Sequence, residues 1–271
     1  MMPTTENIID VQHLVKKFGE LTAVNDASFT VQHGEIFAFL GPNGAGKTTT
    51  IKMLTTLLHP TSGTIRVNGF DPLKQQDEVR NSFGIVFQDP SLDDELTAWE
   101  NLELHGVLYA VPTKLRRERM SQLLEVVGLS DRKDDITRTF SGGMRRRLEI
   151  ARGLLHHPKI LFLDEPTIGL DPQTRNHLWN HVVELNQKEG ITVFLTTHYM
   201  EEADKVAGRI AVIDHGKIVA QGSSAELKAQ TSTQSLEDAF LALTGNSIRE
   251  EESGAIDNMR QMARVWRGKR R

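Results

Sequence analysis

The residues Gly41-Pro42-Asn43-Gly44-Ala45-Gly46-Lys47-Thr48 decide the fold of this 271-residue chain. They match the pattern G-x-x-x-x-G-K-[ST]. They lie between an apolar segment, 36–40, and a segment with apolar residues at helical spacing, 49–58. Glycines let backbone N–H groups approach phosphate oxygens closely, and the start of a helix favours an anion. The stretch therefore predicts a strand, a phosphate-binding loop and a helix in succession.

Two side chains of this motif suit a nucleoside triphosphate. Lys47 supplies a compact cation for the β- and γ-phosphates, and the Thr48 hydroxyl suits Mg²⁺. An ordinary glycine-rich turn is the alternative, and the strand before the motif and the helix after it disfavour that alternative. We expect the chain to bind a nucleoside triphosphate together with Mg²⁺.

A second apolar segment, 160–163, ends in two acidic residues, Asp164 and Glu165. Carboxylates beside a core are costly unless they are paired, so their position favours a function over two solvated acids at a strand end. Asp164 fits the acid that holds Mg²⁺. Glu165 points elsewhere on the strand and fits the group that orients or deprotonates the attacking water. The pair predicts hydrolysis of the bound nucleotide.

The composition excludes several classes of protein. Lys and Arg total 32 against 36 Asp and Glu, a net charge of −4, so no nucleic-acid partner is expected. The chain has no cysteine, which excludes disulfides and thiolate metal sites. No apolar run reaches the about 18 residues of a membrane span. Residues 1–10 lack a signal-peptide pattern, so a cytoplasmic protein is expected.

Strands and helices alternate along most of the chain, which favours an α/β fold with a mostly parallel sheet. Helix formers dominate between 89 and 140, so we expect a helical insertion there. Ser235 and Asp238 form a capping-box pattern that opens a further short helix. The tail 264–271 holds five basic residues; a solvated terminus is favoured over contact with anionic lipid.

The sequence Ser141-Gly142-Gly143-Met144-Arg145, shortly before the Asp-Glu strand, resembles the signature motif of the ATP-binding-cassette (ABC) ATPases. That motif is usually Leu-Ser-Gly-Gly-Gln, so Phe140 and Met144 depart from it. Other residues follow the order of that family: Phe18 is similar to the aromatic residue that stacks on adenine, Gln88 to the Q-loop glutamine, Gly169-Leu170-Asp171 to the D-loop, and His198 to the switch histidine that contacts the γ-phosphate.

The resemblance implies an α/β P-loop NTPase core with an N-terminal antiparallel β subdomain, a helical insertion and a small C-terminal helical appendix. The ATPase domain would span 6–222, with about 89–157 as the inserted helical part, and the appendix with its basic tail would span 223–271. Implied catalytic residues are Glu165, His198, Lys47 and Gln88. The implied metal ligands are Thr48, Gln88 and Asp164. ATP would be bound by Phe18, Gly41, Pro42, Asn43, Gly44, Ala45, Gly46, Lys47, Thr48, Thr49, Ser141, Gly142 and Gly143.

The resemblance also implies partners. ATP would lie between two copies of the chain, the P-loop of one facing the signature helix of the other. A separate membrane permease would dock at about 89–104, including Trp99, and place the protein at the inner face of the cell membrane. The pattern is most similar to the daunorubicin-resistance type of drug-export ATPase. The alternatives are an importer ATPase and a non-transport ABC ATPase; a regulator without turnover is disfavoured because Lys47, Asp164, Glu165 and His198 are all present.

Overall fold

The computed structural model describes residues 7–245, so residue 6 of the expected ATPase domain and the basic tail 264–271 lie outside the described residues. Within this range the strands form two sheets. The first is antiparallel, in the order β2-β1-β4, and consists of β1 (Asn7–Phe18), β2 (Leu21–Gln32) and β4 (Ser62–Val67). The sequence of alternating polar and apolar residues in β2 suits a sheet with one buried face.

The second sheet has the order β5-β6-β7-β3-β8-β9 and is parallel except for its last pair, β8 and β9. Its strands are β3 (Ile36–Leu40), β5 (Phe83–Val86), β6 (Ile160–Asp164), β7 (Thr192–Thr197), β8 (Arg209–Asp214) and β9 (Lys217–Gly222). Every residue of β3, β6 and β7 is buried. Uninterrupted apolar sequence in these strands therefore reflects a sheet that is covered on both faces.

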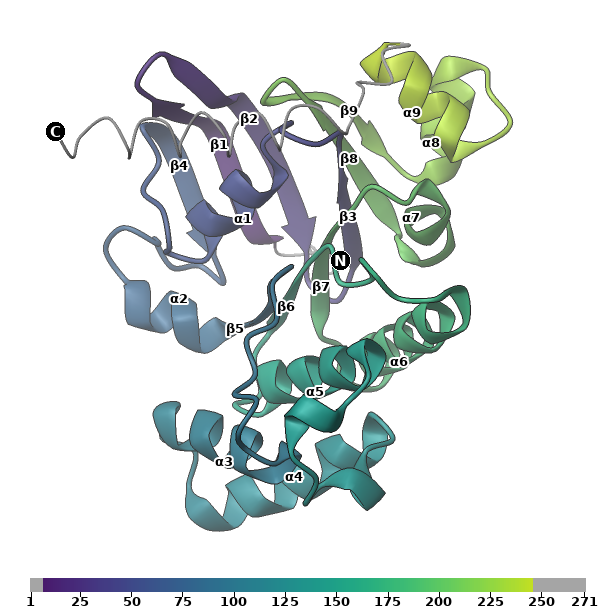
Figure 1. Cartoon of the computed structure of the whole chain (residues 1–271). Helices are drawn as coiled ribbons and strands as arrows, with labels where there is room; N and C mark the ends of the chain where they lie inside the picture. The colour runs from purple at the N-terminus through teal and green to yellow at the C-terminus, as the bar shows by residue number, and fades with distance from the viewer. Residues whose placement is uncertain (1–6, 246–271) are drawn as a thin grey trace, which may run out of the picture.

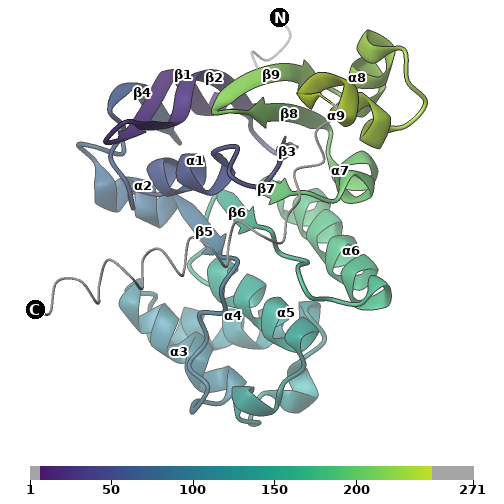
Figure 2. The ribbon, with the colours of Figure 1, turned by 45° about the horizontal axis from the view of Figure 1, so that its top comes forward.

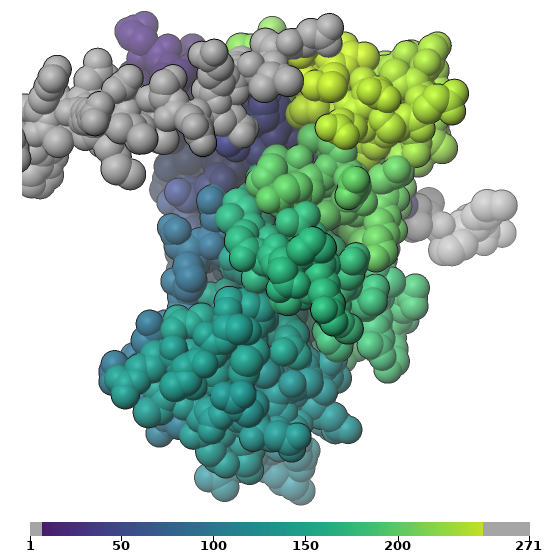
Figure 3. Space-filling model, turned by 45° about the vertical axis from the view of Figure 1, so that its right-hand side comes forward, coloured from purple at the N-terminus to yellow at the C-terminus, as the bar shows by residue number. Residues whose placement is uncertain are grey.

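The helices are α1 (Lys47–Leu54), α2 (Gln76–Ser82), α3 (Ala98–Leu108), α4 (Thr113–Val126), α5 (Gly142–Leu154), α6 (Pro172–Glu189), α7 (Met200–Val206), α8 (Ser224–Thr231) and α9 (Leu236–Thr244), with 3-10 turns at Ser130–Arg132 and Thr137–Thr139. Figure 1 shows α1 beside the antiparallel sheet, α3, α4 and α5 together at the bottom, and α7, α8 and α9 beside β8 and β9. The teal lobe at the bottom of Figure 3 contains α3 and α4 and projects from the part built on the sheets. No helix within residues 7–245 has the length and apolar character needed to cross a bilayer.

Two hydrophobic cores lie on opposite faces of the six-stranded sheet. Alternate residues of β3 separate them: Phe37 and Phe39 belong to the core shared with α1 and the antiparallel sheet, and Ala38 and Leu40 to the core shared with α3 to α6. The first core contains packed aromatic rings; Phe37 and Phe194, for example, lie 5.4 Å apart between centroids. Consequently α1 and α5 pack on opposite sides of the sheet, an arrangement that Figure 2 also shows.

Helix ends follow their sequence signals in most places. Asp171 accepts a hydrogen bond from the Thr174 N–H at the start of α6, and Gly190, at φ 65°, ends that helix. The expected helix over 49–58 was wrong at its end. The helix α1 stops at Leu54, because Thr56 adopts a left-handed backbone, φ 65°, and the N–H groups of 57 and 58 turn back to the carbonyl of Lys52. The expected α/β class with a mostly parallel sheet and a helical insertion is confirmed.

A contact between β5 and α5 generates a stability prediction. A Cβ on Gly84 would lie 2.1 Å from the Gly153 carbonyl oxygen, whereas a Cβ on Gly153 would make only ordinary contacts of 3.6 Å or more. We expect Gly84→Ala to lower the free energy of unfolding by about 1–3 kcal/mol, the usual cost of overpacking a core. The matched variant Gly153→Ala should raise it by about 0.5–1 kcal/mol, because alanine replaces glycine inside a helix.

Urea unfolding of both variants followed by circular dichroism checks this pair. Equal destabilisation by the two substitutions, or a stabilising Gly84→Ala, would show that the two backbones do not approach as closely as described.

Candidate nucleotide site

The phosphate-binding loop lies between β3 and α1 and is built from glycine where a side chain would not fit. Gly46 has φ 110°, and a Cβ there would lie 2.5 Å from the Ala23 carbonyl oxygen. The next residue, Lys47, begins α1 and is buried, and its Nζ donates a hydrogen bond of 2.8 Å to the Gly41 carbonyl. The loop therefore presents backbone N–H groups and one buried cation at the start of a helix, which is an arrangement that binds phosphate.

Polar residues lie at the carboxyl ends of four strands, at one edge of the six-stranded sheet. The loop follows β3, Gln88 follows β5, Asp164 ends β6 and His198 follows β7. These strands are parallel neighbours in the order β5-β6-β7-β3, so their carboxyl ends share that edge. The sequence pattern placed these residues on separate segments, and the sheet brings them together.

A cavity of about 420 Å³ opens beside the loop. It is lined by the aromatic and aliphatic residues of the β1–β2 hairpin, by the loop and α1, and by one residue each from the segments after β5 and β6; these are Phe18, Leu21, Ala23, Pro42, Asn43, Gly44, Ala45, Gly46, Lys47, Thr48, Thr49, Gln88 and Glu165. The Phe18 ring is half exposed, and Lys16 Nζ lies 4.9 Å from its centroid. The cavity thus offers a flat aromatic surface at one end and phosphate-binding groups at the other.

Asp164 is a buried carboxylate held by two hydroxyl groups. Thr196 Oγ1 donates to Asp164 Oδ1 at 2.6 Å, and Thr48 Oγ1 lies 3.5 Å from the same oxygen. Burial raises the pKa of Asp164 above its ordinary value, although both hydroxyl groups oppose that shift. A carboxylate and a hydroxyl this close are oxygen donors of the kind that Mg²⁺ accepts, and Mg²⁺ commonly completes its shell with phosphate and water. The residues present therefore fit a magnesium ion bound together with a nucleotide.

Glu165 lies between two partners that carry or accept positive charge. Its Oε1 is 3.2 Å from Lys47 Nζ, and its Oε2 is 2.7 Å from His198 Nδ1. Burial alone would raise the pKa of Glu165, but the His198 hydrogen bond and the Lys47 charge outweigh burial and lower it. The backbone of Glu165 is left-handed, φ 51°, which is uncommon for a residue other than glycine. An ionised carboxylate at this place can orient water and accept a proton from it.

Ser141 begins α5, where its Oγ accepts a hydrogen bond of 3.3 Å from the Met144 N–H. Among the described residues that line the nucleotide cavity, Ser141, Gly142 and Gly143 do not appear. Because α5 packs on the other face of the sheet from α1, one chain does not bring its own signature residues to its own phosphate-binding loop.

Sequence reasoning did not identify the residues that support these groups. Thr196 contacts both acids, since its Oγ1 also accepts a 3.0 Å hydrogen bond from the Glu165 N–H. The Tyr199 ring packs against the His198 ring at an interplanar angle of 38°, with 4.1 Å between the centroids, and the guanidinium of Arg175 lies 4.1 Å from the Tyr199 centroid. The threonines at the end of the strand before His198, Thr196 and Thr197, were the available signal for Thr196. No local signal indicated Arg175, because its contacts cross from α6 to the loop after β7.

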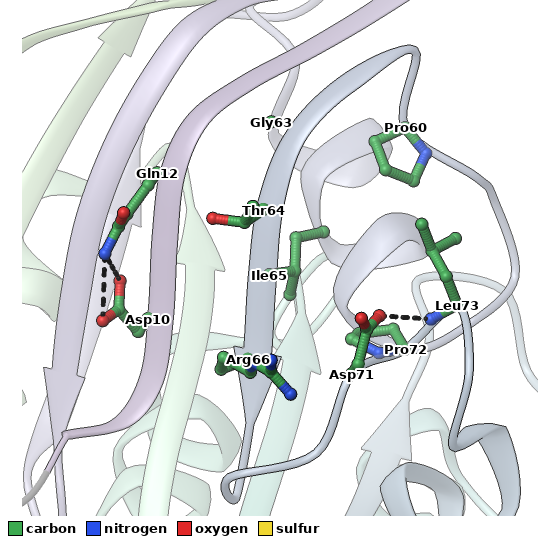
Figure 4. Close-up of a pocket in the computed structure, with 10 residues that line it drawn as sticks. All are labelled: Asp10, Gln12, Pro60, Gly63, Thr64, Ile65, Arg66, Asp71, Pro72 and Leu73. Atoms are coloured by element: carbon green, nitrogen blue, oxygen red, sulfur yellow. Dashed lines mark hydrogen bonds between the residues drawn. The ribbon is translucent and has the colours of Figure 1, made fainter.

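A second cavity, of about 310 Å³, lies elsewhere, on β1, β4 and the segment that follows β4. Figure 4 shows the polar side chains along its wall, where Gln12 donates to Asp10 and the Leu73 N–H donates to Asp71. None of the expected site residues within the described range lines this cavity. It is therefore separate from the nucleotide site.

The opposite pKa shifts of the two acids generate a prediction about thermal stability without nucleotide. The raised pKa of Asp164 means that ionisation costs folding stability, so Asp164→Asn should raise the Tm. The lowered pKa of Glu165 means that ionisation adds stability, so Glu165→Gln should lower the Tm. Each shift should be about 2–4 °C, which corresponds to about 1 kcal/mol for a chain of this size.

The dependence on pH has a definite sign for each acid. Glu165 contributes stability above its unfolded pKa and loses it as the pH falls through its lowered folded pKa. Asp164 contributes stability at low pH and loses it as the pH rises through its raised folded pKa. Differential scanning fluorimetry of both variants between pH 3 and 8 checks this, and shifts of the same sign would contradict the described pairing.

Comparison with known proteins agrees with this site. The family model described as "ABC transporter" matches residues 24–168. The chain is 47% identical over 221 residues to the daunorubicin/doxorubicin resistance ATP-binding protein DrrA of Streptomyces peucetius, covering 82% of this chain and 67% of that protein. It is 40% identical over 252 residues to the linearmycin resistance ATP-binding protein LnrL of Bacillus subtilis (strain 168), covering 93% and 79%.

One similar solved structure is a dimeric ATP-binding cassette in a post-hydrolysis state, bound to ADP and Pi. It has a TM-score of 0.71 and 28% identity, and the match covers 79% of this chain and 98% of that one. The matched family model covers more than half of the chain and includes the phosphate-binding loop, the signature residues and both acids. The chain therefore belongs to the ABC transporter family and is an ATP-binding and ATP-hydrolysing subunit of that family.

Proposed function

We propose that two copies of this chain enclose two ATP molecules and use their hydrolysis to power export through a separate membrane permease. The observation that carries this proposal is the separation of Ser141 from the nucleotide cavity of its own chain. The start of α5 has a serine cap and two glycines that suit a phosphate, yet it packs across the sheet from the loop. In the proposed dimer, a second copy supplies the signature residues that complete each ATP site.

The residues of the site then take defined roles. Phe18 stacks on the adenine, and the N–H groups of the loop and of α1 bind the phosphates. Thr48, Gln88 and Asp164 hold Mg²⁺, which neutralises phosphate charge when it is bound. Two observations support these three ligands. Thr48 Oγ1 lies 3.5 Å from Asp164 Oδ1, and Thr48 and Gln88 line the same cavity.

Lys47 changes partner when ATP binds. Without nucleotide it pairs with Glu165 at 3.2 Å, and the terminal phosphates of ATP offer it a stronger charge. Glu165 then keeps its contact with His198 and is available to orient water and accept its proton. We propose that His198, whose Nδ1 lies 2.7 Å from this carboxylate, contacts the γ-phosphate. Cleavage removes the phosphate that both copies bind, and the dimer opens.

We propose that the cargo is an antibiotic-like small molecule or a lipid, which leaves the cell. The two relatives are daunorubicin/doxorubicin and linearmycin resistance proteins, which supports a small-molecule cargo. The ATPase unit spans 6–222, and the appendix 223–271 follows it. Supporting that division, α8 and α9 follow β9, which is the edge strand of the six-stranded sheet. The chain would lie at the cytoplasmic face of the membrane through its permease.

The permease would dock on the helical insertion at about 89–104. Trp99 is partly buried, packs against the core and is therefore a poor direct contact. One face of α3 is a better candidate for the permease contact than Trp99. It carries Leu104, Val107 and Leu108 at helical spacing, and these residues are 50%, 54% and 74% exposed. Exposed apolar side chains grouped on one helix face suit a protein partner.

The proposed dimer predicts a change of mass. Glu165→Gln should keep ATP binding but slow hydrolysis, so the variant should run as a stable dimer with Mg²⁺ and ATP and as a monomer without them. Size-exclusion chromatography with light scattering measures this. Lys47→Ala is the control, because it removes the buried cation and should stay monomeric with ATP. A Glu165→Gln chain that remains monomeric at saturating ATP would contradict the proposal.

The proposed docking face predicts that substitutions on α3 reduce binding to membranes. Leu104→Glu with Leu108→Glu should reduce sedimentation with membranes about tenfold or more, as for loss of an interface hot spot. Basal ATPase activity and Tm should stay unchanged, because both side chains face solvent. Leu57→Glu is the matched control, since Leu57 is 58% exposed and lies after α1. Equal membrane binding of the double variant and the control would exclude this face.

A further inference from the structure

The helix α5 holds the segment that follows β5 with three charged side chains. Arg146 donates to the carbonyls of Phe87 and Gln88 at 2.5 and 3.0 Å. Glu149 accepts from the backbone N–H of Ser91 at 2.7 Å, and Arg152 donates to the Ser91 carbonyl at 2.5 Å. The three residues are spaced by three positions, so they share one side of the helix.

Arg146 and Glu149 form a buried ion pair beneath this segment. Arg146 NH1 lies 2.9 Å from Glu149 Oε2, and the two side chains are only 8% and 1% exposed. Burial lowers the pKa of Arg146, and the negative charges of Glu149 and Asp164 oppose that shift. A buried pair is retained only where hydrogen bonds satisfy its remaining groups, and here the carbonyls of 87 and 88 do so for the guanidinium.

The shape of the guanidinium matters in this position. Its planar array of five N–H donors serves Glu149 and two carbonyls at once, whereas a lysine ammonium on a flexible chain cannot serve all three in that plane. Arg146 thus binds the backbone of Gln88 but does not line the nucleotide cavity, whereas Gln88 does line it. The helix that carries Arg146 begins at Gly142, and Ser141 caps its start.

We propose that Arg146 is a positioning residue that joins the two ATP sites of the dimer, because its hydrogen bonds to the carbonyls of Phe87 and Gln88 make Gln88 and the Ser141 end of α5 move as one unit. Gln88 lines the site of its own chain, and Ser141 completes the site of the other copy. Occupancy of one site therefore sets the position of the signature residues at the other. This inference rests on the two-copy assembly proposed above.

The test compares Arg146→Lys with Arg145→Lys in the full chain. Arg145 is the neighbouring residue on α5 and pairs with Asp94 at 2.5 Å, so its variant makes a similar change without touching the segment at 87–91. Three quantities are measured for each: the Kd of a fluorescent ATP analogue for the dilute monomer, the ATPase rate against ATP concentration, and the Tm.

We expect Arg146→Lys to lower the Hill coefficient from near two to about one, the values for coupled and independent sites in a dimer. Its kcat should also fall, because occupancy of one site then no longer sets the position of Ser141 at the other. The monomer Kd should match that of Arg145→Lys, whereas the Tm should be lower than that of Arg145→Lys, because lysine leaves a buried acceptor without its hydrogen bond. Glu149→Gln keeps an acceptor for Ser91 but removes the ion pair, so its Hill coefficient and kcat should lie between those of the wild type and of Arg146→Lys. This variant tests the same inference if Arg146→Lys does not fold.

The outcomes separate this inference from the proposed function. A Glu165→Gln chain that never dimerises with ATP would overturn both. If that chain dimerises, the inference alone is overturned by a wild-type Hill coefficient of about one, or by variants that keep the wild-type coefficient and kcat. A loss of monomer affinity in both Arg146→Lys and Glu149→Gln would also overturn it, since a defect within one nucleotide site would then explain the effect.

Discussion

The buried pair of Lys47 and Glu165 is the interaction on which the rest of the site depends. Both side chains are 6% exposed and lie 3.2 Å apart, so neither charge is left without a partner in the low-dielectric interior. In the proposed mechanism Lys47 binds phosphate and Glu165 acts on water, so this pair joins the two roles. An anionic substrate that attracts Lys47 would release Glu165 from that pair, which would link substrate binding to the preparation of the carboxylate.

This pair can form because the sheet is covered on both faces and ends its strands at one edge. Burial of β3, β6 and β7 on both sides fixes their register, and the side chains that follow them meet at the carboxyl end. Thr196 adds a second constraint, since one hydroxyl contacts the Asp164 carboxylate and the Glu165 N–H. The two neighbouring acids consequently differ: Asp164 faces hydroxyl groups and Glu165 faces positive charge, and their pKa values shift in opposite directions.

The helical insertion is connected to this edge through α5. Arg146 and Glu149 hold the segment after β5 at its backbone, while the apolar face of α3 remains exposed further along the same insertion. Hydrogen bonds therefore connect α5 to the segment that follows β5 at this edge of the sheet. Glu165 follows β6 directly and has a left-handed backbone conformation. Its carboxylate contacts Lys47 and His198.

The sequence by itself determined the chemistry and the fold class. Loop glycines, Lys47 and Thr48 act through spacing along one segment, and apolar runs identify buried strands, so these features can be predicted without coordinates. Only the tertiary structure decided which charges meet. The Lys47–Glu165 pair, the two contacts of Thr196 and the hold of Arg146 on 87–88 join residues that are distant in the chain. Their geometry depends on strand register and helix packing, which local residue patterns do not specify.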